Sequence, residues 1–387
     1  MTFIITETTQ TLKAMKQFFI LFYLTFFFFP HLSLKAASTE KFYVGTFTSG
    51  GAEGIYLCSF NSDTGEISLL KTFAGIENPS FLKISPDRKK LYAVTRLQKN
   101  SGKPEGYVNA YAILHDGELQ LLNSQSSNGS DPCYVDVSAD GKFVAVANYG
   151  SGSTSLYRTN EDGSLNPASS VIVNKGSGPN LSRQKSPHAH SIRFSPDGKQ
   201  LFSADLGTDK LNIFNLKRGK LQPAKQQFVS LPPGSGPRHF DYHPGSSIIY
   251  VVNELISTVS VLQKKGKNLE VIQTVSTTPK DFTGTTYCAE VRVSNDGRYV
   301  YASNRGHNSI SVLNVDPVSH KLNLLTTVST EGEWPRHFTL SPDGKFLLVA
   351  NQNSGNIVVF KINEKSGVPE LTGFELKLPA PVCLEFL

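Results

Sequence analysis

Short apolar runs alternate with turns along most of this sequence, and they recur in a fixed order. Each repeat holds an apolar run, a turn similar to Ser-Pro-Asp-Gly, a second apolar run, and usually an Asn or Asp. Such turns reverse the chain sharply, since Pro fixes φ, Asp bonds to nearby backbone and Gly tolerates positive φ. The residues that open the six turns, 47 to 57 positions apart, are Ser85, Ser138, Ser195, His243, Ser294 and Ser341.

Each repeat contains four strand-like segments. Its apolar positions have a period of two and are bounded by turns, which favours strands over helices. After the two runs that flank the turn come a third, such as "SISVLNV", and a fourth, such as "KLNLLTTV". Four strands in about 50 residues are typical of one blade of a β-propeller.

The two ends of the chain complete one further blade. The segment "KFYVGTFTSGGAEGIYLCSF" (41–60) supplies a second and a third strand without a first, and "APVCLEFL" (380–387) resembles a first strand with nothing after it. Joined, they make a seventh unit and remove the free sheet edge. The sequence therefore predicts an all-β, seven-bladed β-propeller over 38–387, closed by the C-terminal strand pairing into the first blade.

Residues 1–37 differ from this repeat. A 12-residue apolar run, Phe18–Phe29, follows Lys13 and Lys16 and precedes small residues, which indicates a secretory signal peptide. The run is short for a membrane span, so we expect no stable span after cleavage, although an uncleaved anchor remains the alternative. The protein is then exported, to the periplasm or the exterior, if the signal functions, and is cytoplasmic otherwise.

Composition excludes several classes of function. The formal net charge is +6 and no dense Lys/Arg tract is present, so nucleic acid is not an expected partner. The four cysteines are widely spaced without a C-x-x-C pair, which argues against a zinc site. His188 and His190 share one face of a strand but have no obvious carboxylate partners, so neither a metal nor a cofactor is expected. The oligomeric state is left open.

Aligning the repeats reveals positions whose chemistry changes from blade to blade while the scaffold repeats. The innermost strand of a propeller blade lines the central channel, and the loop after the second strand reaches one mouth of it. In these positions we find three arginines, a histidine and a glutamate, which together suit an anionic ligand and a proton transfer. The alternative is that they pair with one another for structure alone. These five residues are His190, Arg238, Glu254, Arg305 and Arg336.

At these residues the chain resembles the bacterial 6-phosphogluconolactonase family of seven-bladed propellers, which is related to the carboxy-cis,cis-muconate lactonizing enzyme. The resemblance covers 40–387 and is carried by "SPHAHSIRFSPDGKQLFSADLGTDKL", "GSGPRHFDYHPGSSIIYVVNELISTVSV", "AEVRVSNDGRYVYASNRGHNSISV" and "WPRHFTLSPDGKFLLVANQNSGNIVVF". It implies hydrolysis of a sugar-acid lactone, 6-phosphogluconolactone above all, to the free acid. The related enzyme's proposed site of one His, two Arg and one Glu falls on His190, Arg238, Arg305 and Glu254.

The expected mechanism is attack of water on the lactone carbonyl, with His190 or Glu254 as general base and arginines stabilising the oxyanion. We expect Arg336 to hold the anionic group of the substrate. A signal peptide would export the protein, whereas a phosphorylated sugar lactone is a cytosolic metabolite. Another lactone is therefore an alternative natural substrate. A muconate-type lactonizing isomerase and a non-catalytic exported binding propeller are the alternatives. Further substrate contacts are expected from His239, His337, Asp205, Asn253 and Gln352.

Overall fold

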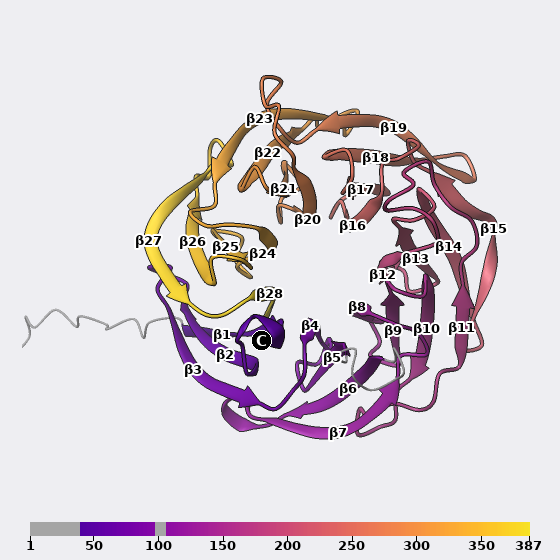
Figure 1. Cartoon of the computed structure of the whole chain (residues 1–387), viewed down its shortest axis with the longest axis vertical. Helices are drawn as coiled ribbons and strands as arrows, with labels where there is room; N and C mark the ends of the chain where they lie inside the picture. Colours follow the sequence, from indigo (N-terminus) through magenta and orange to yellow (C-terminus); the bar gives the residue numbers. More distant parts are fainter. Residues whose placement is uncertain (1–38, 97–105) are drawn as a thin grey trace, which may run out of the picture. The chain divides into compact units, whose positions relative to one another are not determined.

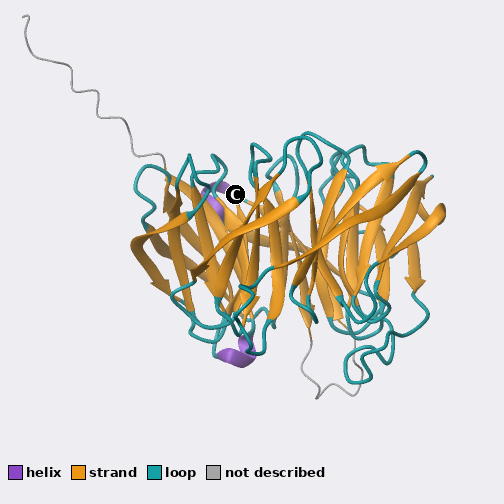
Figure 2. Ribbon diagram, turned by 90° about the horizontal axis from the view of Figure 1, so that it is seen from above, coloured by secondary structure: helices purple, strands orange, loops and turns teal. Residues whose placement is uncertain are grey.

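The computed structural model describes residues 39–96 and 106–387, so the predicted signal peptide lies outside the described residues. Seven four-stranded antiparallel sheets surround a central channel, and each sheet is one blade (Figure 1). The strands run between two faces that carry the loops and turns (Figure 2). Helix within the described ranges is limited to two 3-10 turns, Thr48–Gly50 and His115–Gly117, and neither is long or apolar enough to cross a membrane.

The blades follow one another in sequence order, and in six of them the innermost strand comes first in the chain. Given from the innermost strand outwards, they are β28 (Pro381–Phe386), β1 (Thr39–Thr46), β2 (Gly54–Asn61) and β3 (Ile67–Ala74); β4 (Pro79–Ile84), β5 (Lys90–Arg96), β6 (Gly106–Ile113) and β7 (Leu119–Ser126); β8 (Pro132–Val137), β9 (Phe143–Asn148), β10 (Ser153–Arg158) and β11 (Ser170–Val173); β12 (Ala189–Phe194), β13 (Gln200–Asp205), β14 (Lys210–Lys217) and β15 (Lys220–Ser230); β16 (Pro237–Tyr242), β17 (Ile248–Asn253), β18 (Thr258–Lys265) and β19 (Asn268–Ser276); β20 (Tyr287–Val293), β21 (Tyr299–Arg305), β22 (Ser309–Val315) and β23 (Leu322–Ser329); and β24 (Pro335–Leu340), β25 (Phe346–Asn351), β26 (Asn356–Ile362) and β27 (Pro369–Lys377).

The predicted fold and its closure are confirmed. β28 pairs antiparallel with β1, placing Phe386 opposite Phe42 and Leu384 opposite Val44. The backbone N–H of Leu387 donates to the carbonyl of Lys41 at 2.8 Å and extends this pairing. The first blade is therefore built from both ends of the described chain, and β1 is paired along both of its edges.

The repeated turns hold each inner strand to the next one. In the fourth blade Ser195 Oγ donates to Asp197 Oδ1 at 2.6 Å and accepts the backbone N–H of Gln200 at 2.9 Å. Gly198 completes the turn with φ of 68°. The hydroxyl thus satisfies a turn amide and a turn carboxylate at once, which explains why Ser recurs at this position.

A β-bulge interrupts the pairing near the start of the innermost strands. The register shifts between Pro237 and Phe240 in β16, and between Pro335 and His337 in β24. A bulge adds one residue and breaks the strict alternation of side chains between the two faces. As a result the consecutive residues Arg238 and His239 both reach the same channel cavity.

Further along the same strands lies a set of charged residues, one on each of six of the seven blades, that contact neighbouring blades. Arg193 Nη1 lies 2.5 Å from Asp241 Oδ1, and Asp241 Oδ2 accepts the backbone N–H of Val293 at 3.0 Å. Because these side chains bond across blade boundaries, as Glu385 does to Lys83 and Arg193 does to Asp241, this charged ladder holds neighbouring blades in register. In ring order it alternates in sign over Glu385, Lys83, Asp136, Arg193, Asp241 and Arg292.

Candidate active site

The innermost strands surround a small cavity in the channel. It admits about one water molecule. Its walls combine basic and imidazole groups with small and apolar side chains from the innermost strands of six of the seven blades, all except β20. The lining residues are Ser80, Phe81, Cys133, His190, Arg238, His239, Arg336 and Val382.

Glu254, which follows β17, is the centre of an ionic cluster beside this cavity. Its Oε2 lies 3.1 Å from Arg238 Nε and 2.8 Å from Arg305 Nη2. Its Oε1 lies 2.6 Å from Arg183 Nη2. Three of the four predicted catalytic residues are thus in contact, and His190 Nε2 is 4.0 Å from Glu254 Oε2.

The charges of this cluster do not cancel. Burial opposes ionisation of Glu254, but Arg305, Arg238, His190 and Arg183 together lower its pKa well below its usual range. Burial and the neighbouring Arg305 lower the pKa of Arg238 to about 10, so its guanidinium stays charged at neutral pH. One carboxylate therefore faces several cations, and the cavity wall is positive overall.

Arg336 is the arginine without an anionic partner at this mouth. Within the described residues its guanidinium forms no hydrogen bond or ion pair, and it lies 5.1 Å from the ring centroid of Phe47. Burial and the charges of Arg238, Arg305 and Arg96 lower its pKa well below the ordinary value. A bound anion would offset both the burial of this charge and the repulsion from the neighbouring arginines.

His190 lines the cavity, and among residues 39–96 and 106–387 neither of its ring nitrogens has an oxygen acceptor within hydrogen-bonding distance. Its Nδ1 is 3.8 Å from the thiol of Cys133. Tyr149 contacts its ring edge to face, with the centroids 5.2 Å apart. Burial and nearby Arg238 lower the pKa of His190 well below its usual value, so the ring is neutral at neutral pH.

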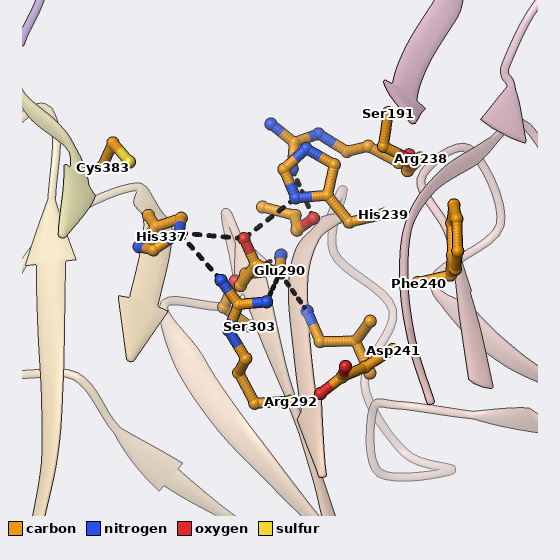
Figure 3. Close-up of polar contacts among 12 residues, drawn as sticks. Ser191, Arg238, His239, Phe240, Asp241, Glu290, Arg292, Ser303, His337 and Cys383 are labelled. Atoms are coloured by element: carbon orange, nitrogen blue, oxygen red, sulfur yellow. Dashed lines mark hydrogen bonds and ion pairs between the residues drawn. The ribbon is translucent and has the colours of Figure 1, made fainter. Parts of the chain in front are cut away.

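A second layer of polar groups lies beneath the arginines. Glu290 Oε2 is 2.9 Å from His239 Nδ1 and 3.2 Å from His337 Nε2. Arg292 completes the layer, with Nη1 3.6 Å from Glu290 Oε1 and Nη2 3.3 Å from His337 Nε2. Figure 3 shows His239, His337 and Arg292 pointing at Glu290 from β16, β24 and β20. His239 also lines the cavity, while His337 does not.

The remaining predicted contact residues point elsewhere. Asp205 accepts backbone N–H groups of His188 and Gly207 at 2.8 and 3.0 Å, which shapes the loop before β12. Asn253 donates to two hydroxyls of β18 in its own blade. Gln352 does not line the cavity, and its Oε1 has no hydrogen-bond partner among the described residues.

Two residues of the site, Arg183 in the ionic cluster and Glu290 in the second layer, were not predicted from the sequence. Arg183 lies in the loop between β11 and β12, outside every repeat, and also donates to the Tyr149 hydroxyl at 3.3 Å. Glu290 stands one position after Ala289, in the same alignment position as His239 and His337. A search for carboxylates in the alignment position of those histidines would have found Glu290, whereas no repeat pattern marks Arg183.

The geometry defines a closed propeller with a cationic, histidine-lined cavity in its channel. The profile of the family described as "Lactonase, 7-bladed beta-propeller" matches residues 41–386. The chain belongs to this family and is a lactone-hydrolysing enzyme.

Similar proteins agree in name and fold. The chain is 38% identical to a 6-phosphogluconolactonase of Bacillus subtilis over 89% of this chain and 97% of that protein. A crystal structure of a putative 6-phosphogluconolactonase from Bacteroides fragilis superposes with a TM-score of 0.84 at 36% identity, covering 91% of this chain and 99% of that one. The periplasmic gluconolactonase of Pseudomonas aeruginosa gives a TM-score of 0.84 at 34% identity, with 90% and 99% covered.

Proposed function

We propose that the protein hydrolyses an anionic sugar-acid lactone, 6-phosphogluconolactone first of all, at the channel cavity. The observation that carries this proposal is Arg336, a guanidinium at the cavity with no anionic partner among the described residues. Arginine binds phosphate or carboxylate through two parallel hydrogen bonds, so it suits the charged end of such a substrate. The names of the Bacillus and Bacteroides relatives support the same substrate.

In the proposed reaction the substrate anion binds to Arg336 and the lactone carbonyl faces Arg238. Arg238 and Arg305 stabilise the oxyanion that develops when water attacks the carbonyl carbon. Glu254 holds these guanidiniums in place at 3.1 and 2.8 Å. The carboxylate of Glu254 is paired with three arginines, which lower its pKa and make it a weak proton acceptor. We therefore assign the general base to a histidine of the cavity instead.

The experiment is a substrate panel. The purified protein is given 6-phosphogluconolactone, gluconolactone and a muconate-type lactone, and acid release is corrected for spontaneous hydrolysis. Gluconolactone is included because the Pseudomonas relative is named for it and because an exported enzyme would meet unphosphorylated lactones. We expect turnover of the phosphorylated lactone, with kcat/KM falling about 10²- to 10³-fold in Arg238→Ala.

Arg298→Ala is the matched control, because Arg298 pairs with Asp296 on the surface and lies far from the channel in the fold. Arg238→Lys, which keeps the charge, tests activity if the alanine variant does not fold. Undiminished turnover in a folded Arg238→Ala variant contradicts the assigned site, and absence of turnover on every lactone contradicts the proposed substrate class.

A further inference from the structure

Two histidines line the cavity, and the structure supports them differently. Within the described part of the chain, no carboxylate or carbonyl lies within hydrogen-bonding distance of either ring nitrogen of His190, and Glu254 Oε2 is 4.0 Å from its Nε2. His239 Nδ1 lies 2.9 Å from Glu290 Oε2. A base works best when its second nitrogen is held by an acceptor, because that bond fixes both the tautomer and the ring orientation.

Glu290 also accepts a hydrogen bond from a second histidine, His337. The backbone N–H of Leu384 donates to His337 Nδ1 at 3.2 Å, so the neutral ring carries its proton on Nε2. With a proton on Nε2, the guanidinium nitrogen of Arg292 at 3.3 Å is a neighbour of the ring and not a hydrogen-bond donor to it. That nitrogen lies 3.2 Å from Glu290 Oε2. The backbone N–H of Val291 donates to Glu290 Oε1 at 3.0 Å. Glu290 is thus surrounded by donors and acts purely as an acceptor.

The same reasoning assigns the tautomer of His239. An acceptor at 2.9 Å from Nδ1 requires the proton of the neutral ring to be on Nδ1. Nε2 then carries the lone pair. It is buried, it has no hydrogen-bond partner among the described residues, and its ring lines the cavity.

The size of the cavity fits this arrangement. It admits about one water molecule and no sugar ring, so the lactone must lie above it on the side of the arginines. A water in the cavity would contact His239 and would also lie next to Arg238 and Arg336, which line the same cavity.

We propose that His239, oriented by Glu290, is the general base that activates the hydrolytic water; this assignment rests on the proposed function. His239 Nε2 takes one proton from water as the water oxygen bonds to the lactone carbonyl carbon, and the carbonyl π electrons move to its oxygen. The oxyanion then re-forms the carbonyl and the bond to the ring oxygen breaks. The leaving oxygen takes the proton back from His239, which yields the open hydroxy acid and restores the base.

The surroundings keep His239 neutral before reaction. Burial and the neighbouring arginines hold the pKa of His239 well below its usual value. The imidazolium formed during attack faces Glu290, which stabilises it as the carboxylate does in a serine-protease triad. The groups around His239 on the surrounding strands are Phe81, Cys133, Tyr134, His190, Arg238, Glu290, Arg292, Arg305, Arg336 and His337.

The test compares four variants of the full chain on the best lactone of the panel. His239→Asn keeps an N–H near Glu290 and deletes the base nitrogen, and we expect kcat to fall about 10²- to 10⁴-fold. KM and product inhibition by the free acid should stay within about threefold, because the arginines remain. Glu290→Gln should lower the plateau of the pH–rate profile and move its acid limb to lower pH, since the imidazolium loses its carboxylate.

His190→Asn and His115→Gln complete the set. His115 is a histidine with a 95% exposed side chain on a surface turn and should leave every rate constant unchanged. Thermal melting shows which variants fold. If His239→Asn does not fold, the base assignment is tested by whether the acid limb of the pH–rate profile shifts in Glu290→Gln.

The outcomes separate the two proposals. Wild-type kcat in a folded His239→Asn variant, with a collapse in His190→Asn, overturns the base assignment and leaves the lactonase site standing. An unmoved acid limb in Glu290→Gln overturns the role of Glu290. A wild-type protein without turnover on any lactone overturns the proposed function itself.

Discussion

Replacing Arg336 by alanine separates substrate binding from chemistry at the channel mouth. The guanidinium is without a carboxylate partner among the described residues, so its removal breaks no ion pair of the fold. The fold loses one cation–π contact to Phe47, worth about 0.5–2 kcal/mol. It also loses the repulsion between Arg336 and the neighbouring arginines, which is a stabilising change. A hydrogen bond to a charged group contributes about 1.5–3 kcal/mol, so binding of a phosphorylated substrate should weaken about 10- to 150-fold.

The assay is initial-rate kinetics on 6-phosphogluconolactone and gluconolactone, with spontaneous hydrolysis subtracted. We expect KM for the phosphorylated lactone to rise by the stated factor at nearly constant kcat, and the values for gluconolactone to change little. Arg158→Ala is the matched control, since Arg158 also lies over a phenyl ring, that of Phe143 at 5.5 Å, but is exposed outside the channel. An equal loss on both lactones, or a loss confined to kcat, refutes the assignment of Arg336 as the anion site.

Two further predictions concern stability and the cysteines. Glu254→Gln leaves Arg183, Arg238 and Arg305 without their anion and should reduce the free energy of unfolding by about 3–5 kcal/mol at neutral pH, measured by urea titration. Because the pKa of Glu254 is lowered in the folded state, its contribution to the free energy of unfolding is complete above the unfolded pKa near 4.5 and is lost as the pH falls below that value. A difference in unfolding free energy between wild type and variant that stays constant below pH 4.5 contradicts this reasoning. All four cysteines are buried, and burial raises the pKa of Cys133 to about 11, so a thiol reagent at pH 7.5 should modify none in the native protein and all four after denaturation; rapid native labelling would show that the channel opens.

The sequence predicts the propeller because each blade is specified locally. The turn hydroxyl, the turn carboxylate and the glycine lie within six residues of one another, as at Ser195, Asp197 and Gly198. Their recurrence counts the blades without knowledge of any long-range contact. The incomplete units at the two ends then leave one arrangement that closes the ring.

The site is predictable only where it follows the repeat. Alignment of the blades brings Arg238, His190 and Arg336 to one cavity because the innermost strand of each blade faces the channel. It fails for Arg183, whose loop belongs to no repeat and whose partner Glu254 is 71 positions away in the chain.

Alignment also cannot give the direction of a side chain next to a bulge or a loop. Asp205 and Asn253 share one alignment position and were expected to contact the substrate. Both instead form hydrogen bonds with nearby loop and strand groups. The partners of Glu290 come from its own strand and from the two neighbouring innermost strands, so its importance appears only once the blades are assembled.

The composite first blade has a consequence for biosynthesis. β28 is synthesised after every other strand of the ring, yet it supplies Val382 to the cavity wall and Glu385 to the charged ladder. Until it emerges from the ribosome, the nascent chain carries β1 with one unpaired edge and a cavity that lacks a wall. Blades can form one by one during translation, but the ring and the cavity wall close only when β28 has been added, so closure depends on the last strand of the propeller to be synthesised.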